Sequence, residues 1–474
     1  MGKRRTPAEE EEAVRVSNAI DEELRVSRAP LAYSARSDPD HPQREREVLR
    51  RRRAKDVKVM LLGQAESGKS TLQKQFQLYY SSKTLDEERP SWRPIVYFNI
   101  LKAIRMILDE LDWQYGLGSS GDPLAVPLAP STSNTSGSGS NSGSSTRSQP
   151  NPAWFPELSL LRNKLLPLVA SEDALAAELS GGVTVSGGRS GVYVRSGWQA
   201  LITGNRSWPL SENYRTAMTP RQSAVTNIVA TTLAASQHEI EMMWWHPGVQ
   251  GLIKSNKLRL EEYAAFFLAN IRRIAQPDYL PSNEDILHVR LQTIGVNEHA
   301  FDINLGGTQY NWLLYDVGGA RGQRHAWVPY FDDATAIIFL APISAFDQYL
   351  EEDPRTNRID DSLQLFTAIC SNKLLSNAAL VLMLNKTDLL RQKLQAGIKV
   401  RKYISSYGDR PNDYEEVCEY FRAHFIQVHR RKDVSHRPLY LHFTSMLDIK
   451  ATQSIIINVG EAIMRQHLTK IGLA

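Results

Sequence analysis

The chain has 474 residues, 42% of them hydrophobic and 23% charged, which is an ordinary balance for a folded protein of two or three domains. A net charge of +4 gives no argument for nucleic acid as a partner, and only two cysteines, Cys370 and Cys418, argue against a disulfide framework and fit a reducing compartment. No apolar run approaches the ~18–20 residues that a membrane-spanning helix needs. The charged N-terminus also lacks the apolar core of a secretory signal, so we do not expect secretion.

Residues 1–53 predict a helical arm that carries charges of both signs. Residues 8–28 and 44–55 have charged helical patterns, and a stretch rich in Pro, Asp and Ser separates them. Gly2 fits a loose acylation pattern, but the charge of Lys3 beside it and the lack of a nearby cysteine for a second chain make acylation the less favoured interpretation.

A buried strand, DVKVMLL, is followed by a glycine-rich turn and then by a helix, and these belong to the first part of an α/β domain over residues 54–84. The turn, GQAESGKS from Gly63 to Ser70, satisfies the P-loop pattern G-x-x-x-x-G-K-[ST]. In such a loop, backbone N–H groups and the helix N-terminus bind phosphate oxygens, Lys69 reaches the β- and γ-phosphates, and the Ser70 hydroxyl binds Mg²⁺. The strand–loop–helix context favours this interpretation over an ordinary glycine turn.

Residues 85–284 predict an inserted all-helical domain, with helical stretches such as PIVYFNILKAIRMILDELDW. Residues 116–152 contain STSNTSGSGSNSGSSTRS, which has no apolar residue, so we expect a disordered loop there. A second insertion, residues 180–223, is rich in Gly and Ser but contains aromatic residues that allow local packing.

Residues 285–474 alternate strands and helices again and predict the second part of the α/β domain. The strands include TQYNWLLYD, TAIIFLAPI, AALVLML and LYLHF. Such alternation predicts a mostly parallel sheet with helices on both faces and ligand-binding loops at the carboxyl ends of the strands. The expected fold class is therefore α/β, with a helical domain inserted into it and a helical arm before it.

Two further motifs follow strands of this second part. The DVGG sequence, Asp316 to Gly319, matches D-x-x-G, in which the aspartate holds Mg²⁺ through water and the last glycine N–H meets the γ-phosphate. The NKTD sequence, Asn385 to Asp388, follows AALVLML. The Asp388 carboxylate can accept two hydrogen bonds from guanine, a donor pair that adenine lacks. This order of motifs favours guanine and argues against a P-loop kinase or ATPase.

Five ordered segments resemble the α subunits of heterotrimeric G proteins: GQAESGKST, DILHVRLQTIGV, DVGGARGQRHAW, MLNKTDLL and HFTSM. The resemblance runs over most of residues 44–473 and is closest to divergent members with long insertions, such as fungi carry. The helical block lies where this family, unlike the small GTPases, has an all-helical insertion. The resemblance implies a Ras-like GTPase domain, bound GTP or GDP with Mg²⁺, and hydrolysis of GTP to GDP.

The resemblance also implies roles for individual residues. Arg290 corresponds to an arginine finger that stabilises charge on the γ-phosphate, and Glu66 to a P-loop glutamate that pairs with it. Thr293 corresponds to a switch threonine that joins Ser70 and, through water, Asp316 in the Mg²⁺ shell. The nucleotide contacts implied in this way are Gly63, Glu66, Ser67, Gly68, Lys69, Ser70, Thr71, Leu287, His288, Arg290, Thr293, Asp316, Gly319, Asn385, Lys386, Asp388 and Met446.

Ala320 is the largest departure from the family pattern. The family has a glutamine here that orients the attacking water, and an alanine side chain can neither donate nor accept a hydrogen bond. Gln323 would lie about 4.5 Å further along the axis of a helix, too far to make the same hydrogen bond without rearrangement. We therefore expect nucleotide binding with slow hydrolysis, unless a water or a partner's residue compensates. Met446 and Ala65 also replace a usual alanine and a usual glycine.

The same resemblance implies a signalling switch. Its partners would be a G protein βγ dimer, a G protein-coupled receptor, a downstream effector and a GTPase-activating regulator, with no nucleic acid among them. The expected location is cytoplasmic and peripheral, at the inner face of the plasma membrane through those partners. Trp327 lies in the expected mobile second switch. The alternative is a nucleotide-loaded scaffold that does not cycle, which shares every binding motif and differs only in turnover and exchange.

Overall fold

The computed structural model of the chain describes residues 56–115, 153–180, 192–194, 224–255, 257–258, 260–293, 295–305 and 308–470. The chain divides into two units, Met1–Ala54 and Lys55–Ala474, and every described residue belongs to the second unit. The expected helical arm and the expected disordered loop over 116–152 lie outside the described residues. So does the second insertion, except for its first residue and for residues 192–194.

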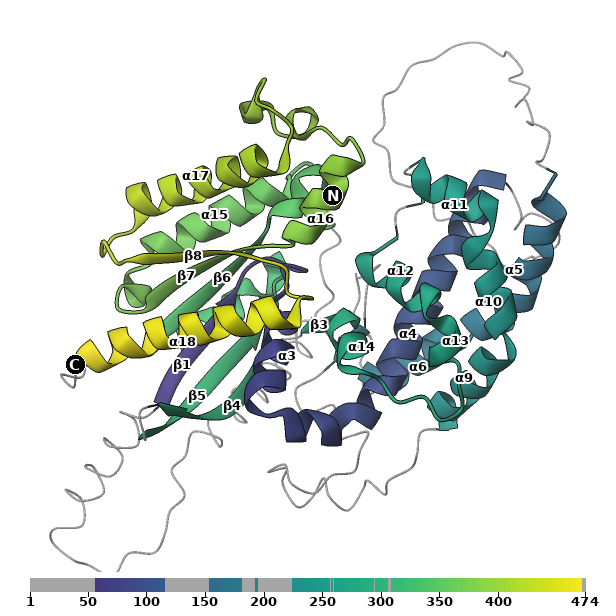
Figure 1. Cartoon of the computed structure of the whole chain (residues 1–474), viewed down its shortest axis with the longest axis horizontal. Coiled ribbons are helices and arrows are strands. Elements are labelled where there is room, and N and C mark those ends of the chain that lie inside the picture. Colours follow the sequence, from purple (N-terminus) through teal and green to yellow (C-terminus); the bar gives the residue numbers. More distant parts are fainter. Residues whose placement is uncertain are drawn as a thin grey trace, which may run out of the picture. The chain divides into compact units, whose positions relative to one another are not determined.

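A six-stranded sheet forms the centre of the α/β domain (Figure 1). In spatial order its strands are β4 (Val296–Leu305), β5 (Thr308–Val317), β1 (Asp56–Leu62), β6 (Ala336–Pro342), β7 (Ala379–Asn385) and β8 (Leu439–Thr444). All neighbouring strands are parallel except the edge strand β4, which is antiparallel to β5. β6 and β7 are buried at every position, as expected of central strands that are covered on both faces.

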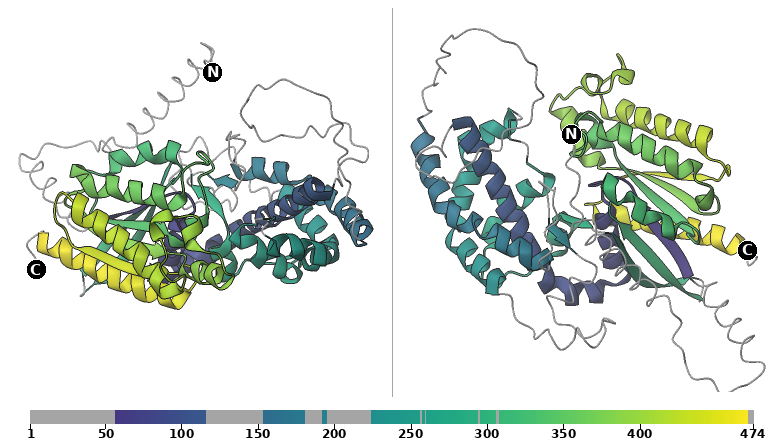
Figure 2. Two further views of the ribbon diagram at one scale, coloured as in Figure 1. Left: turned by 90° about the horizontal axis from the view of Figure 1, so that it is seen from above. Right: turned by 180° about the vertical axis from the view of Figure 1, so that it is seen from behind.

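Helices cover both faces of this sheet (Figure 2): α3 (Lys69–Tyr80) and α18 (Ile449–Lys470) on one, and α15 (Arg358–Ser371), α16 (Thr387–Gln395) and α17 (Tyr414–Lys432) on the other. Successive side chains of a strand point to opposite faces. Val59 of β1 accordingly packs in the same core as α3 and α18, whereas Met60 packs with α15 and α17. Two apolar cores therefore hold the sheet between its helices.

A third, all-helical core belongs to the segment between α3 and the second half of the sheet domain. Its helices are α4 (Ser82–Tyr115), α5 (Phe155–Val169), α6 (Glu172–Ser180), α9 (Ala224–Ala235), α10 (Gln237–Trp245), α11 (Pro247–Lys254), α12 (Glu262–Ala269), α13 (Ile271–Ile274) and α14 (Asn283–His288). Its buried residues form a cluster distinct from the two beside the sheet. The α/β fold class with an inserted helical block is thus confirmed, while the expected domain limits at 85 and 284 stay predictions.

Two very short strands form a second sheet. β2 (Val192–Val194) comes from the second insertion and pairs in parallel with β3 (Leu291–Thr293), so that Val194 is opposite Thr293. The remaining elements are 3-10 segments: η2 (Arg321–Tyr330), η3 (Ile343–Asp347), η4 (Lys373–Leu375), η5 (Val400–Lys402) and η6 (Ser405–Tyr407). Within the described ranges, no helix combines the length and the apolar character that crossing a bilayer requires.

Candidate nucleotide and magnesium site

The P-loop lies between β1 and α3, at the carboxyl end of the strand, and its glycines are required by the backbone. Gly63 and Gly68 have φ angles of 144° and 102°, which side chains rarely adopt. A Cβ on Gly63 would lie 2.4 Å from the carbonyl oxygen of Leu340, and one on Gly68 would lie 2.3 Å from the amide nitrogen of Asn385. The loop therefore packs directly on the neighbouring strands β6 and β7.

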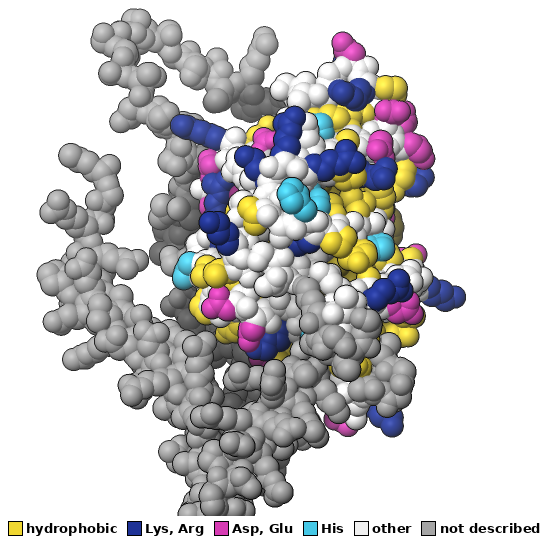
Figure 3. All heavy atoms as spheres, turned by 90° about the vertical axis from the view of Figure 1, so that its left-hand side faces the viewer, with side chains coloured by type: hydrophobic (Ala, Val, Ile, Leu, Met, Phe, Trp, Pro, Cys, Tyr) yellow, Lys and Arg dark blue, Asp and Glu magenta, His cyan; other side chains and the backbone are white. Residues whose placement is uncertain are grey.

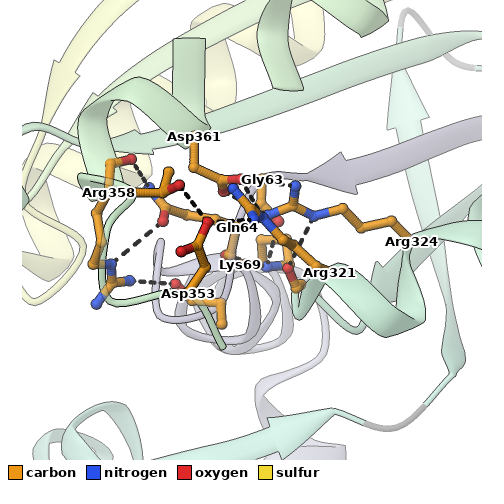
Figure 4. A network of polar contacts seen from close by, with 11 residues as sticks. Gly63, Gln64, Lys69, Arg321, Arg324, Asp353, Arg358 and Asp361 are labelled. Atoms are coloured by element: carbon orange, nitrogen blue, oxygen red, sulfur yellow. Dashed lines mark hydrogen bonds and ion pairs between the residues drawn. The ribbon is translucent and has the colours of Figure 1, made fainter. Parts of the chain in front are cut away.

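The ammonium group of Lys69 lies inside the P-loop. Its Nζ donates hydrogen bonds to the carbonyl oxygens of Gly63 at 3.0 Å and Gln64 at 2.8 Å (Figure 4). Burial lowers the pKa of Lys69 to about 8, against the opposing effect of the nearby Asp316 carboxylate. A buried ammonium is costly unless an anion compensates it, so this position favours a bound phosphate.

Three side-chain oxygens from α3, β3 and β5 converge beside the P-loop. Ser70 Oγ lies 2.7 Å from Asp316 Oδ2 and 3.1 Å from Thr293 Oγ1, and Thr293 Oγ1 donates to Asp316 Oδ2 at 3.0 Å. The other carboxylate oxygen, Asp316 Oδ1, is buried and has no hydrogen-bond partner. Oxygen ligands of this kind are those that Mg²⁺ prefers. The residues present therefore fit a magnesium ion, with an unsatisfied carboxylate oxygen available to a water in its shell.

The D-x-x-G turn is in direct contact with the P-loop. A Cβ on Gly319 would lie 2.5 Å from the backbone nitrogen of Ala65 and 2.6 Å from Lys69 Nζ, so only glycine fits. Trp327, which is 2% exposed, donates from Nε1 to the carbonyl oxygen of Gly318 at 2.9 Å. The buried Trp327 indole thus fixes the D-x-x-G turn in its position beside the P-loop.

The segment after the turn is anchored to α15. Arg324 contacts both oxygens of the Asp361 carboxylate, at 2.6 and 3.1 Å, and Arg321 donates to the same carboxylate at 3.1 Å (Figure 4). Both arginine contacts hold the pKa of Asp361 below its usual value although burial opposes them. Two guanidinium groups therefore fix the start of η2.

Ala320 has an extended backbone, and η2 begins after it. The side chain of Gln323 folds back toward the turn: a Cβ on Gly318 would lie 1.7 Å from Gln323 Oε1 and 2.8 Å from the Thr293 carbonyl oxygen. Gln323 Oε1 is buried without a hydrogen-bond partner. The carboxamide of Gln323 thus lies beside the turn, in a 3-10 segment, while the expectation that it is too far from position 320 to make the glutamine's hydrogen bond stays a prediction.

A pocket between the helical block and the carboxyl ends of the strands brings together many of the predicted nucleotide contacts. These are Glu66, Gly68, Thr71, Leu287, His288, Arg290, Asn385, Lys386, Asp388 and Met446. The remaining predicted residues, Gly63, Ser67, Lys69, Ser70, Thr293, Asp316 and Gly319, belong to the adjoining phosphate and magnesium region described above. Leu260, Glu261 and Tyr263 of the helical block also line the pocket, and the sequence contained no motif that indicated them.

The NKTD motif is connected to the P-loop. Asn385 Nδ2 donates to the Ser67 carbonyl oxygen at 2.8 Å, and Thr444 Oγ1 donates to Asn385 Oδ1 at 3.0 Å. The carbonyl oxygen of Met446 accepts a hydrogen bond from Gln75 of α3 at 2.8 Å. The NKTD segment, the segment around Met446 and the P-loop with its helix are therefore parts of one hydrogen-bonded framework.

Glu66 is bound by two arginines. Its carboxylate contacts Arg290 and, at 2.6 Å, Arg358 Nη1. Burial raises the pKa of Glu66, but the charges of Arg358 and Arg290 outweigh it and lower the pKa to about 2. Arg358, which the sequence did not indicate, also forms two hydrogen bonds with Gln64 (Figure 4). Gln64 Nε2 donates to the Arg358 carbonyl oxygen at 2.8 Å, and Arg358 Nε donates to Gln64 Oε1 at 3.3 Å.

Fold and site together define a P-loop nucleotide-binding protein whose pocket is completed by a helical insertion. The sequence profile described as G-protein alpha subunit matches residues 34–463. This chain belongs to the G protein α-subunit family.

Proteins of this family from fungi and mammals are similar to the chain over most of their length. The guanine nucleotide-binding protein alpha-4 subunit of Mycosarcoma maydis is 34% identical over 88% of this chain and 83% of its own. The alpha-1 subunit of the same fungus is 28% identical over 94% of this chain and 99% of its own. The human guanine nucleotide-binding protein subunit alpha-13 is 26% identical over 88% and 87% of the two chains.

Proposed function

We propose that this α subunit binds GTP and GDP with Mg²⁺, relays a signal from a membrane receptor to an effector, and hydrolyses GTP slowly. The observation that carries the slow rate is Ala320, which follows a D-x-x-G turn whose other parts are in place. The chain retains what binding requires and lacks the side chain that would position water.

The binding roles follow from the contacts. Lys69 would compensate the charge of the β- and γ-phosphates, and Ser70, Thr293 and, through water, Asp316 would hold Mg²⁺. Asp388, in the wall of the pocket, would accept the guanine N1–H and N2–H₂ hydrogen bonds. Bound Mg²⁺ would supply positive charge against the developing charge of the transferred phosphoryl group.

The hydrolytic roles belong to Arg290 and Glu66. Arg290 would stabilise charge on the γ-phosphate, and Glu66 would orient that guanidinium through their ion pair. A side chain that positions the reacting water and its proton contributes about 10²–10⁴ in rate. The absence of the glutamine at position 320 therefore corresponds to a loss of roughly 3–5 kcal/mol of transition-state stabilisation.

The proposed partners are a G protein βγ dimer, a G protein-coupled receptor, an effector and a GTPase-activating regulator, and the proposed location is peripheral at the inner face of the plasma membrane. Family membership supports these partners. Figure 3 shows a face on which hydrophobic side chains gather beside Lys and Arg side chains. Near the C-terminus, Phe443, Leu447 and Ile457 are each at least 36% exposed, and exposed apolar side chains of this size suit a protein partner.

Single-turnover hydrolysis of preloaded GTP tests the slow rate. The Ala320→Gln variant should hydrolyse GTP about 10²–10⁴ times faster than the native chain. Equal rates in the two proteins would refute the assignment of Ala320. Competition of GTP with ATP for the purified protein tests the guanine assignment in the same preparation.

The second candidate is a nucleotide-loaded scaffold that does not cycle, and the same Ala320 observation favours it. Release of bound nucleotide, measured with and without a receptor-mimicking activator, separates the two candidates. Nucleotide release that the activator accelerates supports the switch. Release at the same rate with and without the activator supports the scaffold.

A further inference from the structure

Glu261 is an acidic side chain of the helical block that reaches the proposed arginine finger. It lies directly before α12, and its carboxylate forms an ion pair with the guanidinium of Arg290. The Glu261 side chain is 21% exposed and that of Arg290 is 12% exposed, so both lie largely out of water. This ion pair is therefore less screened than one on the surface.

Arg290 is held by the helical block in two ways. Its backbone N–H donates to Asn99 Oδ1 at 2.8 Å, and its carbonyl oxygen accepts from Asn99 Nδ2 at 3.2 Å, where Asn99 belongs to α4. Its Nη1 contacts Glu261, while Nη2 contacts Glu66 of the P-loop. The main chain and one end of the guanidinium are thus fixed by the helical block, and only the other end faces the P-loop.

The γ-phosphate of a nucleotide would have to compete with these carboxylates. A guanidinium binds a phosphate strongly when two of its N–H groups are available for a bidentate contact. Glu66 has a second arginine, Arg358, at 2.6 Å, which can keep its charge compensated if Arg290 turns away. Glu261 sits in the same pocket wall and competes for Arg290 from the opposite end.

We propose that Glu261 is a positioning residue that restrains Arg290 and weakens its contact with the γ-phosphate. This inference rests on the proposed binding of GTP and deepens it, since it concerns the same site. Glu261 acts as a brake on the arginine finger that is independent of Ala320. The slow GTPase then has two separate causes, one at the water and one at the arginine.

The test compares Glu261→Gln with the native chain in two measurements. The first is the affinity for a non-hydrolysable GTP analogue relative to GDP, and the second is single-turnover hydrolysis. We expect the affinity ratio and the hydrolysis rate each to rise about three- to tenfold, which is the range expected for one partly buried ion pair. The matched control is Glu241→Gln, which removes an ion pair with Arg272 elsewhere in the helical block and should change neither quantity.

The Arg290→Gln background distinguishes this brake from a structural role. If Glu261 acts through Arg290, Glu261→Gln should no longer change the affinity ratio once the guanidinium is absent. An equal gain in both backgrounds, or no gain in the native background, would overturn the proposal. Failure of GTP to bind at all to the native chain would instead refute the proposed function.

Glu261→Asp is a second variant that distinguishes a weakened ion pair from a folding defect. Its carboxylate is retained but is one methylene shorter, so the ion pair should weaken and the affinity ratio should fall between those of the native chain and Glu261→Gln. Thermal unfolding of all three proteins shows whether they are folded. A ratio for Glu261→Asp above that of Glu261→Gln would count against the proposal.

Discussion

Asn385 Nδ2 donates a hydrogen bond at 2.8 Å to the carbonyl oxygen of Ser67, and both groups are buried. The residue that begins the NKTD motif therefore supports the P-loop backbone 318 positions earlier in the chain. The NKTD motif and the P-loop are thus linked directly by a buried hydrogen bond.

Replacing Asn385 by alanine should weaken nucleotide binding through the P-loop. The Ser67 carbonyl would remain buried without its donor, at a cost of about 1–3 kcal/mol. We expect GDP release to become about 10 to 100 times faster, measured with a fluorescent GDP. The matched control is Asn412→Ala, because Asn412 also bonds backbone groups, at Ile398 and Val400, away from the pocket. Unchanged release from Asn385→Ala would show that the hydrogen bond carries no binding energy.

Gln323 should support the residual hydrolysis that remains with Ala320. Its carboxamide lies beside Gly318 and the Thr293 carbonyl, with Oε1 unpartnered, so it can contact a water there. Gln323→Ala should lower the single-turnover rate about tenfold or more in the native background. In the Ala320→Gln background the loss should be much smaller. A rate unaffected by Gln323→Ala in both backgrounds would remove Gln323 from the mechanism.

Ser70→Ala should lower the affinity of the GTP-loaded protein for Mg²⁺. The change removes one of three converging oxygens and leaves Asp316 with one partner fewer. We expect the Mg²⁺ concentration at half-saturation to rise about tenfold or more. Tryptophan fluorescence, recorded while the GTP-loaded protein is titrated with Mg²⁺, measures this concentration. Ser371→Ala serves as control, because this hydroxyl bonds only the backbone of its own helix. Identical titrations for the two variants would exclude Ser70 as a ligand.

Stability should fall in acid partly through Glu66. Its pKa is about 2 in the folded chain against a usual value of 4.5, so the charged form is favoured by folding. This contribution is complete above pH 4.5 and is lost as the pH falls from about 4.5 to about 2. Glu66→Gln should therefore show a shallower decline of melting temperature over that window. A decline as steep as that of the native chain would mean that other carboxylates dominate.

The sequence predicted the parts of the site that are local in the chain. The P-loop, D-x-x-G and NKTD are short patterns at strand ends, and the alternation of strands with helices places strand ends on one edge of a sheet. Arg358 and Glu261 have no such pattern, because their ion pairs are formed with residues that are not adjacent in sequence. Arg358 reaches Glu66 from 292 positions away.

The position of the Gln323 carboxamide beside Gly318 could not be predicted from the sequence for a different reason. The segment that follows Ala320 is a 3-10 helix, and residue spacing alone does not distinguish a 3-10 helix from an α-helix. The short strand β2 was also unforeseen, since three residues within a Gly- and Ser-rich insertion carry too little periodicity to identify a strand.

The pairing of β2 with β3 has a consequence for regulators. A strand edge with unpaired backbone groups is a ready template for another chain, which can add a strand of its own. Here the insertion occupies one edge of the segment Leu291–Thr293, as far as Thr293 itself. β2 therefore already occupies this strand edge, and any partner that recognised the edge by strand addition would first have to displace β2.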